Sequence, residues 1–135
     1  MWVAFSDSTR KALAELETGS DRVIAVVGGA IIDSSLTDVL KQDLSIDTSD
    51  FTREIQGLVF QPDGPLGNFG AKISMAYLLG YFTREAHNDL QNFKSIRNLF
   101  AHYSEHNSFE TQKIKDRCAN FKRKILILSQ PAWLD

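Results

Sequence analysis

The fold of this chain is decided by the stretch Lys94-Ser95-Ile96-Arg97-Asn98-Leu99-Phe100-Ala101-His102-Tyr103, residues 94–103. Apolar residues recur in it, and just before it, at three- and four-residue steps, which is the period of a helix with a buried side. The stretch therefore predicts the last turns of a long, mostly buried helix. Arg97, Asn98 and His102 interrupt the apolar pattern near the helix end, and such side chains are seldom buried without partners.

The same periodicity runs through the rest of the chain and predicts an all-α fold. We expect a single-domain bundle, residues 1–135, of about six helices, because 135 residues suffice for one core. Ser6 or Ser8, Ser20, Thr48-Ser49-Asp50, Thr83 and Asn107-Ser108 are candidate caps. The expected helices are a short one after Ser6 or Ser8, 21–44, a short one to about Leu58, 69–82, 83–103 and 109–128. Residues 61–70 hold two of the three prolines and predict a structured turn.

The run Val23-Ile24-Ala25-Val26-Val27-Gly28-Gly29 has an alternative interpretation, a strand followed by a phosphate-binding loop. We reject it because no Gly-x-Gly-x-x-Gly or Gly-Lys-Ser/Thr motif is present and no second strand follows. Gly28 and Gly29 are instead expected to let a neighbouring helix approach closely, although each glycine lowers helix propensity by roughly 1 kcal/mol.

Several motifs between about Asp21 and Phe121 resemble, in their order and spacing, the mannitol operon repressor family of bacterial proteins. They are Gly64-Pro65-Leu66-Gly67-Asn68-Phe69-Gly70-Ala71-Lys72-Ile73, Ala76-Tyr77-Leu78-Leu79-Gly80, Asp89-Leu90 and Arg97-Asn98-Leu99-Phe100-Ala101-His102. The resemblance implies an all-helical fold. It also implies a transcription-associated regulator of carbohydrate (mannitol) uptake or use.

Arg97 and His102 carry a second, shorter resemblance, to the Arg-x4-His motif of HEPN-domain proteins, many of which are RNA-cleaving dimers. In such a toxin-type, metal-independent ribonuclease, His102 would serve as general acid or base near neutral pH. Arg97 would stabilise the phosphate charge and Asn98 would position the scissile phosphate. An RNA-binding or RNA-cleaving protein is therefore the alternative to the regulator, and a plain interaction module is a third possibility.

The same residues also have a structural interpretation, which we favour, because five helical residues place Arg97 and His102 about 140° apart around the axis. Arg97 would hold a buried acid, Asn98 would bridge to a neighbouring backbone, and His102 would cap carbonyls at the helix end. Asp33 is the first choice for the acid, because it lies mid-way along an otherwise apolar helix. Lys72 is the competing cation for Asp33.

Lys72 and Asp89 complete this expected polar network. Lys72 is the only charge in the 69–82 helix, and it could instead extend from the first turn to solvent. Asp89 precedes Arg97 by eight residues, about 12 Å along a helix axis, which is beyond comfortable reach. The complete network is Asp33, Lys72, Asp89, Arg97, Asn98 and His102.

Composition predicts a cytoplasmic protein without metal or cofactor. Hydrophobic content is 43% and charged content 24%, which is ordinary for a globular domain. No stretch approaches the roughly 18–20 apolar residues of a membrane span, and the N-terminus shows no secretory pattern. Cys118 is alone, which excludes an internal disulfide and a cysteine-based zinc site. His87, His102 and His106 lack the spacing and carboxylates of a zinc site, and His87 and His106 are expected at the surface.

The charge balance argues against a free-standing DNA-binding protein. Net charge is −2, whereas DNA affinity comes from many phosphate contacts. Residues 1–60 hold 5 Lys/Arg and 10 Asp/Glu, and residues 61–135 hold 10 and 7. The basic excess comes mainly from Lys113, Lys115, Arg117, Lys122, Arg123 and Lys124. We interpret these residues as a solvated face of the last helix rather than a nucleic-acid patch, so the regulator is expected to act through a protein partner.

Large apolar residues near both ends of the chain predict that these ends pack against another surface. Trp2, Phe5, Trp133 and Leu134 would be in water if the ends were unpacked. Small domains rarely expose such groups without a use. At least some of them are expected in a homodimer or against the core.

Overall fold

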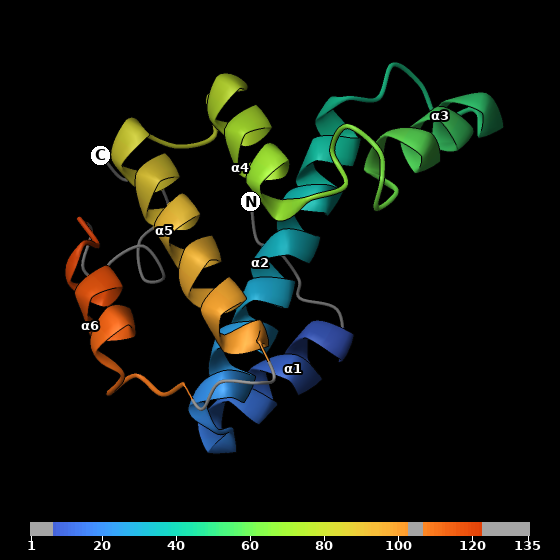
Figure 1. Cartoon of the computed structure of the whole chain (residues 1–135). Coiled ribbons are helices and arrows are strands. Elements are labelled where there is room, and N and C mark those ends of the chain that lie inside the picture. Colours follow the sequence, from blue (N-terminus) through green and yellow to red (C-terminus); the bar gives the residue numbers. More distant parts are fainter. Residues whose placement is uncertain (1–6, 103–106, 123–135) are drawn as a thin grey trace, which may run out of the picture.

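The computed structural model confirms the all-α fold over the residues that it describes, 7–102 and 107–122. Helices and connecting turns account for these residues, and none of them is in a strand. The helices are α1 (Asp7–Thr18), α2 (Asp21–Asp43), α3 (Asp50–Phe60), α4 (Phe69–Leu78), α5 (Arg84–Ala101) and α6 (Gln112–Ala119) (Figure 1).

The second helix, α2, is the one on which the bundle is assembled. α1, α4 and α5 all pack against it, α4 also packs against α5, and α6 packs against α5. Figure 1 shows α3 standing away from this group, beyond the end of α2. A core of Ala25, Ile96, Phe100 and Ile114 joins α2, α5 and α6. The stretch that predicted the fold therefore does contribute two of the core residues.

The close approach of helices that the glycine pair predicts is found at Gly29. Gly29 is buried, and a Cβ placed there would overlap the side chain of Arg97 from α5. At Gly28 a Cβ would lie 3.7 Å from the ring of Phe93, which is an ordinary contact. Only Gly29 is therefore required for the packing of α5 on α2.

Four helix starts are set by side-chain caps. The side chains of Ser20, Ser49, Asn68 and Thr83 each accept a hydrogen bond from the backbone N–H three residues on, at 2.8 to 3.3 Å. Such caps satisfy donors that the first helical turn leaves unpaired. The predicted caps Ser20, Ser49 and Thr83 are confirmed, and the helix that follows Ser49 runs to Phe60 rather than Leu58.

The prediction that the fourth helix continues to Phe82 is wrong, because Gly80 ends it. Gly80 has φ +81°, a left-handed conformation that glycine adopts without a steric penalty. Its N–H donates to Tyr77 O at 2.9 Å, and the N–H of Tyr81 donates to Ala76 O at 3.0 Å. This pair of bonds is the Schellman motif, which terminates helices.

Tyr81 then ties the turn after α4 to the end of α2. Its hydroxyl donates a hydrogen bond to the carboxylate of Asp43. Burial, this hydrogen bond and the negative charge of Asp43 raise the pKa of Tyr81 to about 12. The hydroxyl therefore keeps its proton, and can donate to Asp43, to a higher pH than an exposed tyrosine would.

The last predicted helix, 109–128, is also shorter than expected within the described residues. It starts at Gln112 and ends at Ala119, with Asn120 as C-cap. Ahead of it the N–H of Ser108 donates to Thr111 Oγ1 at 2.9 Å and the N–H of Glu110 to Ser108 Oγ at 3.1 Å. Such side-chain bonds offer the backbone an alternative to helix. The predicted helical residues 123–128, Tyr103 at the end of α5, and His106 lie outside the described residues.

By length and composition alone, α2 could cross a membrane, contrary to our expectation that no stretch approaches such a span. One such helix near the N-terminus is weak support for a membrane protein, because the central helix of a bundle meets the same criteria. Here α2 packs against three other helices, with Ala25, Gly29 and Leu40 buried. No membrane segment is inferred from it.

The Schellman motif predicts opposite effects for two Gly→Ala substitutions. Gly80→Ala should lower the free energy of unfolding by about 1–2 kcal/mol, because alanine is strained at a left-handed position. Gly57→Ala is the control: it lies inside α3 with open space around it, and should be neutral or stabilising. Urea unfolding followed by circular dichroism measures both, and equal effects would contradict this account of how α4 ends.

Candidate functional site

A largely buried ion pair joins α2 to α4. Lys72 Nζ is 2.8 Å from Asp33 Oδ1, and the two side chains are 7% and 30% exposed. Lys72 is on the first turn of α4, and its ammonium group points into the bundle rather than to solvent. A buried ammonium requires a partner of opposite charge, and Asp33 supplies it.

Arg97 does not form the carboxylate pair predicted for it. Its Nε and Nη2 donate to Asn98 Oδ1 at 3.3 and 3.0 Å, and its guanidinium carbon lies 4.9 Å from the centre of the Phe69 ring. The stem of Arg97 passes over Gly29, which is one turn, about 6 Å, before Asp33 along α2. Arg97 of α5 therefore contacts α2 one turn before Asp33, and Lys72 forms the pair with Asp33 instead.

Asn98 and His102 are exposed, and their contacts differ from the structural roles predicted for them. Asn98 accepts from its neighbour Arg97 and was expected to bridge to another backbone segment. His102 is the C-cap residue of α5, but its backbone carbonyl makes the contact, accepting from Arg22 Nη2 at 3.1 Å. Over residues 7–102 and 107–122, no hydrogen bond joins Arg97 to His102.

Asp89 belongs to a different part of the molecule from the ion pair. It is buried in α5, and its Oδ1 accepts the backbone N–H of Lys122 at 2.9 Å. This bond holds the segment after α6 against α5. The six predicted residues therefore fall into four separate contacts: Asp33 with Lys72, Arg97 with Asn98, the backbone of His102 with Arg22, and Asp89 with the backbone of Lys122.

Sequence reasoning missed a polar contact between α4 and α5. Ser74 Oγ lies 3.4 Å from His87 Nε2, and Gln91 Nε2 donates to both Ser74 Oγ (3.3 Å) and Gly70 O (3.2 Å). His87 is half-buried, with its ring centre 5.3 Å from that of Tyr77, although we expected it at the surface. No motif marks these residues, because their contact depends on how two helices cross.

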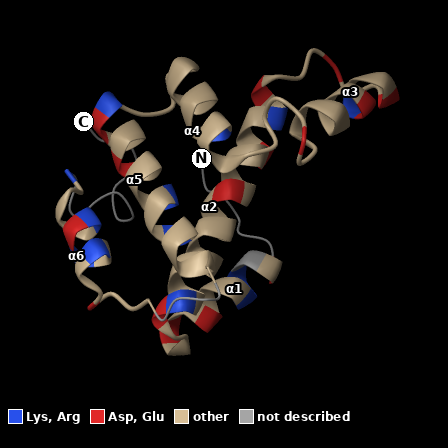
Figure 2. Cartoon of the chain, viewed as in Figure 1, with Lys and Arg blue, Asp and Glu red and all other residues tan. Residues whose placement is uncertain are grey.

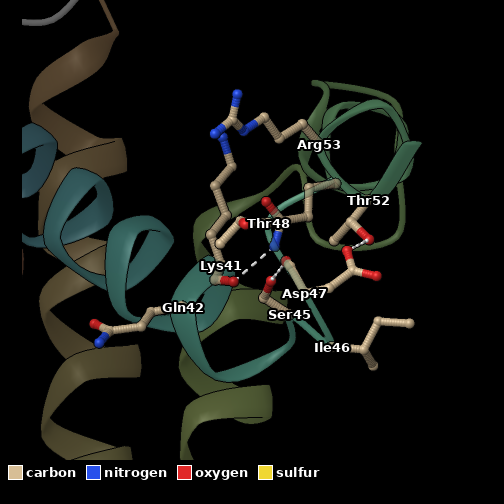
Figure 3. A pocket seen from close by; sticks show the side chains of 9 residues that line it. Lys41, Gln42, Ser45, Ile46, Asp47, Thr48, Thr52 and Arg53 are labelled. Atoms are coloured by element: carbon tan, nitrogen blue, oxygen red, sulfur yellow. Dashed lines mark hydrogen bonds between the residues drawn. The ribbon is translucent and has the colours of Figure 1, made fainter. Parts of the chain in front are cut away.

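An open pocket of about 450 Å³ lies where α2 meets α3 (Figure 3). Asp47 accepts from the N–H and hydroxyl of Ser49 and from the hydroxyl of Thr52, and the bond from Thr52 contributes most to lowering its pKa. Gln56 Nε2 donates to Lys41 O at 2.7 Å, which ties α3 to α2. The pocket is lined by Lys41, Gln42, Ser45, Ile46, Asp47, Thr48, Thr52, Arg53 and Gln56.

No metal centre is formed by the part of the chain that the structure describes. None of its His, Cys, Asp and Glu residues gather in a group of three or more that could hold an ion. Cys118 is half-buried, and burial raises the pKa of its thiol, which disfavours the reactive thiolate form. The described side chains thus offer hydrogen bonds and ion pairs that join helices.

Comparison with known proteins shows a likeness to a solved structure. No protein-family model and no curated protein sequence matches the chain. A chain of the X-ray structure of the MtlR–HPr complex from Escherichia coli is similar, with a TM-score of 0.67 and 16% identity, covering 87% of this chain and 71% of that one. MtlR is the mannitol repressor. At this identity the likeness shows a shared fold.

The Lys72–Asp33 pair predicts a non-additive pattern of stability losses. Lys72→Met should lower the free energy of unfolding by about 2–3 kcal/mol, because it leaves a carboxylate without its cation. This value lies at or below the low end of the range for fully buried pairs, since Asp33 is partly solvated. Asp33→Leu combined with Lys72→Met should recover most of the loss. Urea unfolding of the two single variants and the double variant measures this coupling, and strictly additive losses would refute it.

Proposed function

We propose that this chain is a mannitol-repressor-like regulator of transcription that acts through a protein partner rather than by reading DNA alone. The observation that carries the proposal is the likeness to a chain of the MtlR–HPr complex, in which a repressor is bound to a second protein. The motifs between Asp21 and Phe121 resemble those of the same family, although no family model matches the chain. An HPr-type protein is the proposed partner, and carbohydrate (mannitol) uptake or use is the proposed process.

The distribution of charge supports an indirect action on DNA. Acidic and basic residues stand close together along α1, α3 and α6, rather than forming one basic face (Figure 2). Proteins that read DNA unaided need a basic surface that follows the phosphates. With a net charge of −2, the chain is better suited to contact a protein than a duplex.

The ribonuclease alternative gains no support from the polar residues. Two donors of Arg97 are engaged by Asn98, and His102 makes its contact through the backbone. In the Arg-x4-His interpretation the guanidinium and imidazole must converge on one phosphate. A catalytic role for Arg97, Asn98 and His102 would need the guanidinium and imidazole to converge beyond the end of α5, where His102 is the C-cap, or across two copies of the chain.

The homodimer and the cytoplasmic location complete the proposal. The apolar residues that suggested a dimer, Trp2, Phe5, Trp133 and Leu134, lie outside the described residues. Regulation of an operon through a second protein takes place where both the operon and that protein are found, and for a bacterial operon this is the cytoplasm.

Calorimetric titration with HPr is the direct test. The full chain should bind HPr of its own organism with a 1:1 ratio and a Kd in the micromolar range, which corresponds to a binding free energy on the order of −8 kcal/mol. A gel-shift with mannitol-operon operator DNA should show no tight complex of the chain alone at physiological salt. A tight, sequence-specific shift without any partner would contradict the indirect mechanism, and absence of HPr binding would remove the proposed partner.

The ribonuclease alternative is tested separately. Structured RNA incubated with the wild type and with His102→Ala should remain intact in both cases. Cleavage by the wild type that is lost in His102→Ala would replace the regulator by a nuclease. Circular dichroism of the variant controls for folding, which should be unaffected because the His102 side chain is exposed.

A further inference from the structure

The helix α3 carries an apolar face that nothing in the described chain covers. Phe51, Ile55 and Leu58 follow one another at steps of four and three, so they lie on one side of the helix. They are 69%, 42% and 53% exposed, and no residue of α3 is buried. Ile46, in the loop before α3, is almost fully exposed as well, and in Figure 3 its side chain points away from the helices.

The opposite side of α3 holds the helix to the body. Gln56 Nε2 donates to Lys41 O at 2.7 Å, and Lys41 Nζ lies 5.5 Å from the centre of the Phe60 ring. At 100° per residue, Gln56 is about 100° or more around the helix from Phe51, Ile55 and Leu58. The apolar face therefore points away from the attachment to α2. This arrangement leaves it available to another molecule.

Carboxylates border the apolar face along one edge. Glu54 is roughly 40° around the helix from Leu58, and Asp50 is one turn before Glu54 on the same edge. The nearest cation, Arg53, lies 3.7 Å from Asp50 and offsets part of its charge, so Glu54 contributes most of the negative charge of this edge. Phe51, Ile55 and Leu58 with Asp50 and Glu54 make up what we call the α3 surface, which is apolar with an acidic edge.

We propose that the α3 surface is the docking site for the protein partner and that the partner presents an amphipathic segment with basic residues. Apolar side chains of that segment would cover Phe51, Ile55 and Leu58, and its Lys or Arg would lie beside Asp50 and Glu54. Burial of the three side chains supplies the affinity, and the acidic edge selects the charge of the partner. This inference rests on the proposed function, because it gives the partner a place on the fold.

A second copy of this chain is a poorer occupant of the α3 surface. Two α3 helices packed face to face and antiparallel, about a two-fold axis, have their acidic edges on the same side of the interface. Asp50 and Glu54 from both copies would then form a group of four carboxylates. Like charges at such distances repel and favour a different partner. The charge of the edge thus disfavours this antiparallel dimer relative to a basic segment.

The test uses two designed amphipathic helical peptides that share a leucine face and differ only in flanking residues, lysine in one and glutamate in the other. Fluorescence anisotropy with the full chain should give a Kd for the lysine peptide that is at least roughly tenfold lower than the Kd for the glutamate peptide. The Kd of the lysine peptide should rise with salt concentration, because salt screens its attraction to the acidic edge. Phe51→Ala with Leu58→Ala should weaken this binding by roughly tenfold or more. Alanine keeps α3 helical, so the loss would report the face and not the helix.

Two control variants make the test specific. Leu78→Ala removes an apolar side chain at the end of α4 that is 76% exposed, more than any of the three on α3, and should leave peptide binding unchanged. Asp50→Lys with Glu54→Lys should reverse the preference toward the glutamate peptide. Equal binding of the two peptides by the wild type, or an equal loss in Leu78→Ala, would overturn the proposal.

Other occupants give different results. A wild-type chain that sediments as a dimer and becomes a monomer in Phe51→Ala with Leu58→Ala would assign the α3 surface to a second copy. Displacement of the lysine peptide by a peptide with the sequence of residues 123–135, at lower concentration than the lysine peptide itself, would assign it to the chain's own end. Either result overturns the partner-docking proposal.

Titration of the same variants with HPr separates this inference from the proposed function. HPr binding that is weakened at least tenfold in Phe51→Ala with Leu58→Ala, but not in Leu78→Ala, supports both. HPr binding that is equal in all variants keeps the function and overturns the α3 site. Charge-selective peptide binding at α3 without any HPr binding keeps the α3 site and overturns HPr as the partner.

Discussion

The contact between Lys72 and Asp33 is the interaction on which the arrangement of the bundle depends. Each is a charged residue in an otherwise apolar part of its helix, and together they lie at the crossing of α2 and α4. The cost of burying a charge without a partner exceeds the gain from a single apolar contact. Helix crossings that separate Lys72 from Asp33 are therefore unfavourable. Replacing both residues by apolar ones could leave stability unchanged. The pair thus determines which packing of the helices forms more than it raises the stability of that packing.

The identity of the cation at this crossing also shows where sequence analysis succeeded and failed. Periodicity and composition were enough for the all-α class, for most helix starts and for Asp33 as an acid in need of a cation. They could not choose between Lys72 and Arg97, because the choice depends on axial placement. Arg97 lies over Gly29, about 6 Å from the level of Asp33, and that offset follows from packing between helices.

Helix ends show the same division. Ser20, Ser49 and Thr83 were predictable because a cap is a local bond between a side chain and a nearby N–H. Gly80 was assigned to the helix interior because the apolar pattern continues past it, yet its left-handed backbone ends α4. The local bonds of Ser108 and Thr111 likewise shortened α6. Where a pattern and a local backbone preference disagreed, the backbone preference prevailed.

The candidate site predicted from the sequence differs from the α3 surface for a related reason. Arg97, Asn98 and His102 suggested a functional site because of their chemistry. In the structure Arg97 donates to its neighbour Asn98 and packs its stem over Gly29. The backbone carbonyl of His102, rather than its imidazole, makes a contact. The α3 surface is built from ordinary residues, and its apolar side looks like any amphipathic helix in sequence. Only the three-dimensional arrangement shows that this side faces away from α2. A protein that works by binding a partner needs such an uncovered face more than it needs reactive groups, and an acidic edge gives that face a selectivity that apolar contact alone lacks.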